Sequence, residues 1–174
     1  DVVHALRAQG YRHVRAPRHL VPSGPPPATF WIDRHVPALL VLPAGCELHE
    51  QQMVRSGALI LQDKASCFPP VALRPSASDR VVDGCAAPGN KTSMLCASGC
   101  EVLAVERDAA RAHTLRARLA LAAAPASVHE ADFLSIDPSE QPWCHVTKMM
   151  MDPSCAAHAE PARVGPHARL ICPA

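Results

Sequence analysis

The sequence is poor in aromatic residues and has neither a long hydrophobic run nor a strong excess of one charge. Aromatic residues make up 3% of the 174 positions, so a core must rest mainly on Ala, Val and Leu. No apolar run reaches the roughly 18 residues of a membrane span, and we therefore expect no membrane segment. The net charge of +1 gives no overall basic field that would indicate a nucleic-acid partner.

Eight cysteines are present, but their spacing is not that of a disulfide framework or a zinc site. No Cys-x-x-Cys pair occurs, and no secretory hydrophobic segment is present. Cys96 and Cys100 could share one face of a helix, yet two further ligands at zinc spacing are missing. We expect reduced, mostly buried thiols in a cytosolic or nuclear protein, and no metal site.

Positive charge is concentrated at the start of the chain. Arg7, Arg12, Arg15 and Arg18 face only Asp1 in the first twenty residues. A basic edge of this size is more often a solvated face than a binding strip. Since the chain starts without a methionine and enters a helical pattern at once, we expect a fragment of a longer protein.

The pattern of residues predicts two regions. Residues 1–60 read as a small α+β unit: a helix that ends near Gly10, then strands over 11–15, 30–33 and 37–43, with a proline-rich loop before the second strand. Residues 61–174 alternate strands and helices, with strands expected within 80–84, 101–108, 126–133 and 145–155, the last of which includes the loop after its strand. A helix is expected over 109–123, where Leu115 and Leu119 recur at helical spacing. This alternation predicts an α/β fold with a parallel sheet and crossover helices.

The strongest motif is Asp83–Thr92 (DGCAAPGNKT), at the end of the first strand of the second region. Small residues there let the backbone approach a ligand, and the following helix offers unpaired N–H groups. A P-loop is disfavoured, because Asn90 intrudes before Lys91 and shifts the phosphate cradle out of register. The G-x-G-x-x-G pattern of dinucleotide-binding proteins is absent.

Three further residues follow the next two strands. Glu106 could accept hydrogen bonds from both ribose hydroxyls of a nucleoside cofactor, whereas a lone Glu after a strand is usually a solvated cap. Arg111 could help to hold the cofactor or lie on the surface of its helix. Asp132 could bond an adenine amino group or cap a turn.

The fourth expected strand is followed by Asp152, Pro153 and Cys155. Ligands of open α/β sheets bind at the carboxyl ends of the strands, so an Asp and a Cys held there by a proline turn are placed for chemistry. A structural turn cysteine would be the ordinary interpretation, but the presence of the first motif favours a functional one.

Three stretches together, residues 83–92, residues 59–70 (LILQDKASCFPP) and residues 151–155 (MDPSC), resemble the NOL1/NOP2/Sun, or RsmB/NOP2-type, family of RNA cytosine-C5 methyltransferases. The GNKT and DPSC forms are most similar to its eukaryotic 28S rRNA branch. The resemblance covers roughly residues 30–155. It implies an incomplete class I Rossmann-like core that binds S-adenosylmethionine, with about four of the usual seven strands, preceded by an RNA-binding-like unit.

The resemblance also implies roles for individual residues. The family's catalytic positions match Lys91, Asp152 and Cys155, and Cys155 matches the cysteine that assists release of the RNA product. Gln62 and Asp63 match a stretch before the family's first strand. The family's cofactor-binding positions match the following residues: Cys85, Ala86, Ala87, Pro88, Gly89, Asn90, Lys91, Glu106, Arg111, Asp132 and Asp152.

The family's nucleophilic cysteine stands in a Thr-Cys pair well beyond the Asp-Pro motif, and this sequence has no Thr-Cys pair. Cys172 is too early and lacks the Thr, so it is not assigned. In the family's chemistry a thiolate adds at C6 of cytosine, which makes C5 nucleophilic enough to accept a methyl group, and loss of the C5 proton then expels the thiolate. We expect an inactive fragment that binds cofactor weakly.

The resemblance implies an RNA partner, large-subunit rRNA, and a nuclear or nucleolar location. Two other functions stay open from the residues alone. One is a non-catalytic remnant that binds S-adenosylmethionine or RNA, and the other is a nucleotide-binding ATPase, which the register of Asn90 disfavours. The oligomeric state cannot be read from the sequence.

Overall fold

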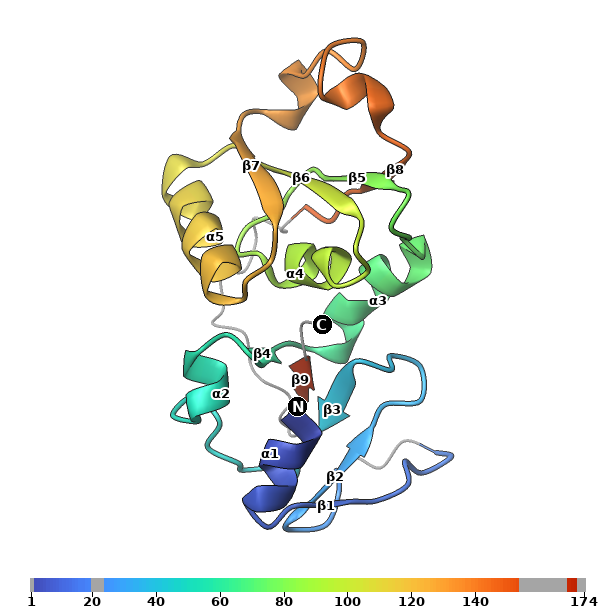
Figure 1. The fold of residues 1–174 in the computed structure, drawn as a ribbon, viewed down its shortest axis with the longest axis vertical. Helices are drawn as coiled ribbons and strands as arrows, with labels where there is room; N and C mark the ends of the chain where they lie inside the picture. Colours follow the sequence, from blue (N-terminus) through green and yellow to red (C-terminus); the bar gives the residue numbers. More distant parts are fainter. Residues whose placement is uncertain (1, 20–23, 154–168, 172–174) are drawn as a thin grey trace. The chain divides into compact units, whose positions relative to one another are not determined.

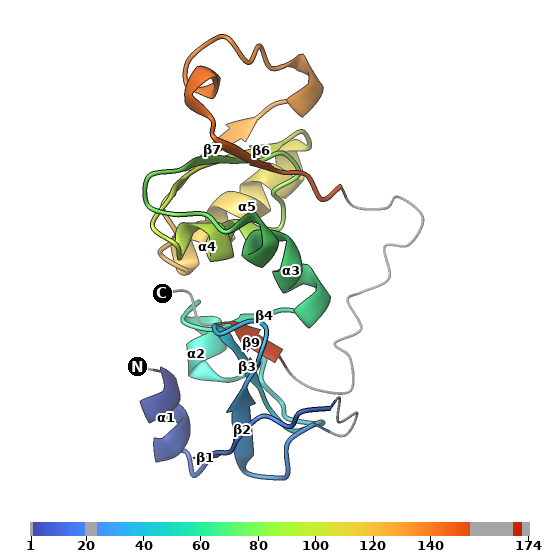
Figure 2. The same ribbon diagram turned by 90° about the vertical axis from the view of Figure 1, so that its right-hand side faces the viewer.

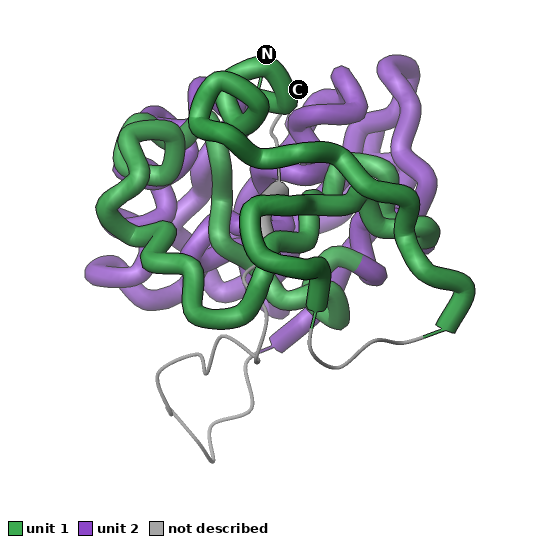
Figure 3. The backbone as a smooth tube through the Cα atoms, turned by 90° about the horizontal axis from the view of Figure 1, so that it is seen from below, with its two compact units in different colours: residues 1–67, 160–173 green, residues 68–159, 174 purple. Residues whose placement is uncertain are grey.

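A computed structural model describes residues 2–19 and 24–153, and the backbone of residues 169–171. The chain divides into two compact units, which Figure 3 shows in different colours. Unit 1 comprises residues 1–67 and 160–173, and unit 2 comprises residues 68–159 and 174. Cys155 and Cys172 lie outside the described residues. No helix in the described ranges is long and apolar enough to cross a bilayer.

Unit 1 is a mixed sheet with short helices. Its sheet has the order β1-β2-β3-β9-β4, in which β1 runs parallel to β2 and the other neighbours are antiparallel. The expected helix and strands of the first sixty residues are present, although β1 is only two residues long. The elements are α1 (Val2–Ala8), β1 (Arg12–His13), β2 (Thr29–Ile32), β3 (Leu39–Val41), α2 (Gln52–Arg55), β4 (Ile60–Leu61) and β9 (Arg169–Ile171).

A leucine-rich cluster around one phenylalanine forms the core of unit 1. Phe30 on β2 is fully buried, and Leu6 of α1 is almost as inaccessible. Four further leucines complete the cluster: Leu40, Leu42, Leu48 and Leu59. As the composition predicts, aliphatic side chains rather than aromatic ones supply most of this core.

Unit 2 is an open parallel sheet, which confirms the predicted α/β class. The strand order is β7-β6-β5-β8, and all three pairings are parallel. Its elements are β5 (Arg80–Asp83), α4 (Asn90–Cys96), β6 (Glu101–Glu106), α5 (Ala109–Leu121), β7 (Ala126–Glu130) and β8 (Lys148–Met150). Between β7 and β8 lie two 3-10 turns, η1 (Phe133–Ser135) and η2 (Trp143–His145). The order reverses at β5, because the chain adds β6 and β7 on one side and β8 on the other.

The two faces of this sheet bury alternate residues. Val81 and Val102 pack with Leu95 of α4, whereas Val82 and Leu103 pack with the segment that contains η1 and η2. Side chains alternate between faces along a strand, so one apolar run supplies both layers. Figures 1 and 2 show α4 and α5 on the same face of the sheet, as right-handed crossovers in one direction require.

Several elements were not expected from the sequence. The helix α3 (Lys64–Leu73) contains Pro69 and Pro70 and begins in unit 1. Prolines ordinarily end a helix because they remove an N–H donor and clash with the preceding turn, and this helix runs through both. The backbone of β9 pairs with β3 and β4, a contact between distant parts of the chain that local periodicity does not reveal.

Candidate functional site

A pocket of about 330 Å³ opens within unit 2, where the parallel strands end. It is lined by residues that follow each of the four strands, beside the point at which the strand order reverses. Open α/β sheets bind ligands at this place. The lining residues are Gly84, Cys85, Glu106, Arg107, Arg111, Ala131, Asp132, Phe133, Leu134, Met151 and Pro153.

The turn after β5 brings backbone to the pocket. Gly84 donates its N–H to the carbonyl of Met150 at 3.0 Å, which ties the turn to the end of β8. A Cβ at Gly84 would overlap the sulfur of Met151, so a larger residue at this turn would require the Met151 side chain to move. The next residue, Cys85, is half-buried, and burial first, then the carboxylates of Asp83 and Glu106, raise the pKa of its thiol. Cys85 is therefore a neutral thiol at pH 7.

Glu106, at the end of β6, places a buried carboxylate at the pocket. Its Oε1 accepts the N–H of Asp108 at 3.1 Å, and its Oε2 lies 3.4 Å from Nη2 of Arg111. The same Nη2 donates to the carbonyl of Ala87 at 3.0 Å. Arg111 thus joins the turn after β5 to the carboxylate after β6. A carboxylate has about four acceptor positions, so Glu106 keeps capacity for a ligand's hydroxyl groups.

Asp132 caps a turn, which is one of the two roles that the sequence left open, and it also lines the pocket. It is the N-cap of η1, where its Oδ1 accepts the N–H of Leu134 at 3.0 Å. It also lines the pocket, with Oδ2 at 3.8 Å from Nη1 of Arg107. Capping fixes the orientation of this carboxylate at the rim, because one of its oxygens is held by the backbone.

Lys91 and Asp152 form an ion pair at the carboxyl ends of the parallel strands. Nζ of Lys91, near the start of α4, lies 2.8 Å from Oδ2 of Asp152, which follows β8. Both side chains are partly accessible. The structure therefore brings together two residues that are far apart in the sequence and were both predicted to be functional.

A buried carboxylate at this edge received no role from the sequence. Asp83, the last residue of β5, is 1% exposed and accepts the hydroxyl of Thr92 at 2.8 Å. Burial raises the pKa of Asp83 to about 6, although the Thr92 hydroxyl, the Cys85 N–H and Lys91 oppose this. Its position at a strand end before a glycine is the signal that could have pointed to it.

The remaining predicted residues lie away from the pocket lining. Ala86 and Ala87 are buried with Leu115 and Leu119 of α5, and Asn90 accepts a hydrogen bond from Arg118. Pro88 and Gly89 complete the turn into α4, while Gln62 and Asp63 belong to unit 1. No group of three His, Cys, Asp or Glu side chains in the described residues is placed to hold a metal ion.

Two protein families match this chain. The ferredoxin-like domain of NOL1/NOP2/Sun domain family member 5 matches residues 1–62, and the 16S rRNA methyltransferase RsmB/F family matches residues 70–165. Among solved structures, a methyltransferase homolog protein from Pyrococcus horikoshii is 23% identical, with a TM-score of 0.55 over 76% of this chain and 39% of that one. Similarity at this level shows the fold alone.

Sequence relatives extend the match. The 28S rRNA (cytosine-C(5))-methyltransferase of Mus musculus is 42% identical over 131 residues, which cover 73% of this chain and 28% of the relative. The 25S rRNA (cytosine-C(5))-methyltransferase rcm1 of Schizosaccharomyces pombe is 37% identical over 135 residues, 75% of this chain and 29% of the relative. The chain thus spans less than a third of the length of these curated relatives. It belongs to the NOL1/NOP2/Sun (RsmB/NOP2-type) family of RNA cytosine-C5 methyltransferases and is most similar to the eukaryotic large-subunit rRNA branch.

Proposed function

We propose that unit 2 binds S-adenosylmethionine in the pocket at its strand ends, as the cofactor-binding part of an rRNA cytosine-C5 methyltransferase. One observation carries this proposal: a single pocket joins the glycine turn after the first parallel strand, Glu106 after the second and Asp132 after the third. The family membership supports the reaction class.

The polar groups fit a nucleoside with a charged tail. Glu106 is assigned to the two ribose hydroxyls, and Arg111, whose Nη2 lies 3.4 Å from Oε2, holds its carboxylate in place. Asp132 is assigned to the adenine amino group, next to the apolar side chains of Phe133 and Leu134. Gly84 and Cys85 line the same space. When bound, S-adenosylmethionine supplies an electrophilic methyl group.

Lys91 and Asp152 are assigned to the cytosine side of the reaction. Asp152 would orient the edge of a base that has been turned out of any helix. Lys91 holds that carboxylate at 2.8 Å and places positive charge where a thiolate would need it. Cys155 keeps its proposed part in product release, although it lies outside the described residues.

Residues 1–174 contain no Thr-Cys pair, which favours a second candidate function: binding of cofactor and RNA without catalysis by this stretch alone. RNA that contains 5-azacytidine distinguishes the two functions, since it traps an attacking cysteine covalently. We expect no cross-link with the 174-residue chain. A cross-link that disappears in Cys155→Ser would show that this stretch attacks cytosine itself.

Calorimetry tests the cofactor assignment directly. The chain is titrated with S-adenosylmethionine and, separately, with ATP under the same conditions. We expect binding of S-adenosylmethionine and weaker or undetectable binding of ATP. Tighter binding of ATP would overturn the proposed function. We also propose a nucleolar location. Microscopy of the encoded protein fused to a fluorescent protein checks it.

A further inference from the structure

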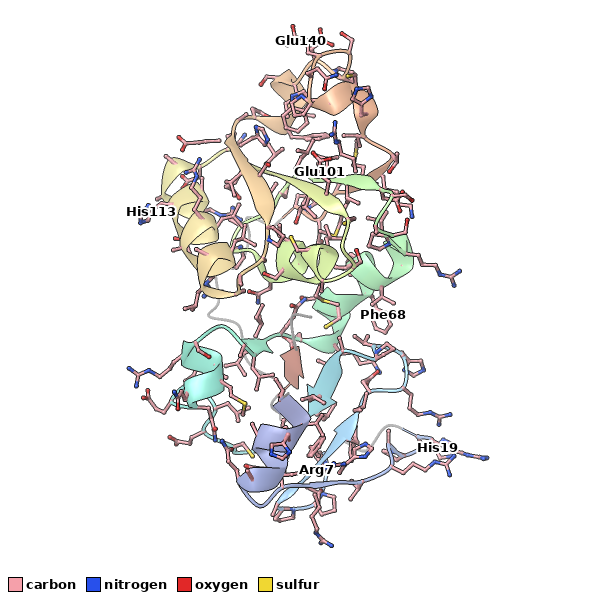
Figure 4. The ribbon with its side chains drawn as sticks, viewed as in Figure 1. Arg7, His19, Phe68, Glu101, His113 and Glu140 are labelled. Carbon is pink, nitrogen blue, oxygen red and sulfur yellow. The ribbon has the colours of Figure 1, made fainter. Side chains whose placement is uncertain are left out.

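Arg107, the residue after Glu106, has no function in the sequence motifs, although the structure places it at the pocket. Strand β6 begins at Glu101, which Figure 4 marks, and Arg107 is the first residue after the other end of that strand. It lines the pocket, and its side chain is 79% exposed, whereas that of Glu106 is 7% exposed. Glu106 therefore lies in the buried part of the pocket and Arg107 at its mouth.

The backbone on both sides of Arg107 is held by hydrogen bonds. The carbonyl of Glu106 accepts the N–H of Ala131, which follows β7, at 3.2 Å. The carbonyl of Asp108 accepts the N–H of Ala112 in α5 at 2.8 Å. The Arg107 side chain thus starts from a fixed point of the fold, while its exposed guanidinium can adjust to a ligand in the pocket.

Asp132 and Leu134 lie at the mouth together with Arg107. Nη1 of Arg107 lies 3.8 Å from Oδ2 of Asp132, which is too long for a hydrogen bond. An ion pair between accessible side chains is weak, so the guanidinium can move onto a ligand at little cost. Leu134 lines the pocket and is 88% exposed, although it is apolar. A planar cation, an apolar side chain and a carboxylate acceptor together suit a flat aromatic ring that carries an amino group.

We propose that Arg107 stacks its guanidinium on the adenine ring of bound S-adenosylmethionine, while Asp132 accepts the adenine amino group. A guanidinium is planar and stacks on aromatic faces with a cation–π contribution. Its distance of 3.8 Å from Oδ2 of Asp132 is typical of atoms in non-bonded contact, about 3.5–4.0 Å, so an adenine that is hydrogen-bonded to Asp132 lies within its reach. The inference rests on the proposed function, because it adds a residue to the same cofactor site.

A second role for Arg107 would act through charge alone, by holding the Asp132 carboxylate in place. The two roles differ in what a substitution must keep. Stacking needs a flat side chain and tolerates loss of the charge, whereas orientation of Asp132 needs the charge and tolerates loss of the plane. Arg107→Phe keeps only the plane, Arg107→Lys keeps only the charge, and Arg107→Ala keeps neither.

Calorimetry of the full 174-residue chain with S-adenosylmethionine compares these variants. We expect Arg107→Ala to weaken binding roughly two- to fivefold, the range of a cation–π contact at an exposed site. Arg107→Phe should keep the affinity of the unsubstituted chain, and Arg107→Lys should bind less tightly than Arg107→Phe. Methylthioadenosine has the same nucleoside without the amino-acid tail. Arg107→Ala should weaken its binding by the same factor, because the lost contact is with the base.

Arg116→Ala is the matched control. Nη1 of Arg116 lies 3.6 Å from Oε2 of Glu130, a pair similar to that of Arg107 and Asp132, but neither Arg116 nor Glu130 lines the pocket. This variant should leave the dissociation constant of S-adenosylmethionine unchanged. Nuclear magnetic resonance gives a second readout: in the complex, nuclear Overhauser effects should connect the aromatic protons of adenine with the side chain of Arg107. Orientation of Asp132 alone would not produce this contact.

Three outcomes would overturn the stacking role. Arg107→Ala could bind as tightly as the unsubstituted chain. Arg107→Lys could keep full affinity while Arg107→Phe loses it, which would show that only the charge matters. Arg116→Ala could weaken binding equally, which would show an effect of net charge. Glu106→Ala separates this failure from failure of the cofactor site: if it weakens binding and Arg107→Ala does not, the site stands and the stacking role alone is wrong. If the unsubstituted chain does not bind S-adenosylmethionine, both are wrong.

Discussion

The ion pairs of unit 1 and unit 2 lie at different kinds of place in the fold. In unit 2, basic side chains pair with carboxylates that stand at the ends of strands: Lys91 with Asp152, and Arg111 with Glu106. In unit 1, Lys64 pairs with Asp33, and neither residue lines the pocket. The pairs of unit 2 hold a preformed site in place, whereas this pair of unit 1 joins two segments of its own fold. The contrast gives charge pairs different roles in the two units: the geometry of the site in unit 2 and stability in unit 1.

The units also differ in how their sheets are built. In unit 2 each parallel strand is joined to the next by a connection that stays within the unit, whereas the sheet of unit 1 takes in β9 from the far end of the sequence. A division of this kind predicts that a substitution in the core of one unit destabilises that unit and leaves the other unit's core unaffected.

The largest expected effect comes from truncating one buried side chain in the core of each unit, in separate variants. Phe30→Ala in unit 1 should cost about 3–5 kcal/mol, and Leu103→Ala in unit 2 about 2–5 kcal/mol, because both side chains are fully buried. Hydrogen exchange read by mass spectrometry should speed up in β2 and β3 for the first variant, and in β5 to β7 for the second. Leu121→Ala, at a half-exposed site, is the control. Equal acceleration in both units for either core variant would contradict the division.

A buried carboxylate and a partly buried one should respond oppositely to pH. Burial raises the pKa of Asp83 to about 6, so between about pH 4 and 6 the native state holds a proton that the unfolded chain has lost. The free energy of unfolding therefore falls as pH rises through that window. Asparagine carries no charge, so Asp83→Asn removes this pH-dependent decrease in the free energy of unfolding. It should stabilise the protein at pH 7 by about 2–3 kcal/mol.

Asp33 in unit 1 is the opposite case. Burial raises its pKa, but the hydrogen bonds from Lys64 and from the N–H groups of His35 and Val36 outweigh burial and lower it below the usual range. Its contribution is present above the unfolded pKa and is lost as pH falls through the folded pKa. Asp33→Asn should destabilise the protein at pH 7. Denaturant unfolding from pH 3 to pH 8 checks both signs, and a stabilised Asp33→Asn protein would contradict this account.

The sequence predicted unit 2 better than unit 1 for physical reasons. Apolar strands that end in Gly or an acidic residue, and the spacing of Leu115 and Leu119, are local signals. They located β5, α5 and the position of Glu106. Pairing of β9, burial of Asp83 and the contact of Arg111 with the Ala87 carbonyl depend on residues that are distant in the sequence, so no local pattern contains them.

Removing the acid at the pocket should have a smaller but specific effect. Glu106→Ala should weaken binding of S-adenosylmethionine by about 1.5–3 kcal/mol, roughly ten- to a hundredfold, because charge-assisted hydrogen bonds to the ribose are lost. Glu130→Ala, which removes a half-exposed carboxylate paired with Arg116 at the end of β7, should leave the dissociation constant unchanged. Calorimetry on both folded variants makes the comparison. An unchanged constant in Glu106→Ala would show that the ribose assignment is wrong.

The smallest expected effect concerns how one helix in each unit starts. In unit 2, Asp108 caps α5, and its Oδ1 accepts the N–H of Arg111 at 2.8 Å. In unit 1, Gln51 precedes α2 without a side-chain capping bond. Asp108→Ala should therefore cost about 1 kcal/mol, while Gln51→Ala should change the unfolding free energy by less than about 0.5 kcal/mol. Asp108→Asn keeps an acceptor and should recover most of the loss, which urea unfolding of the three variants measures. If Gln51→Ala costs as much as Asp108→Ala, side-chain capping does not distinguish the two helices.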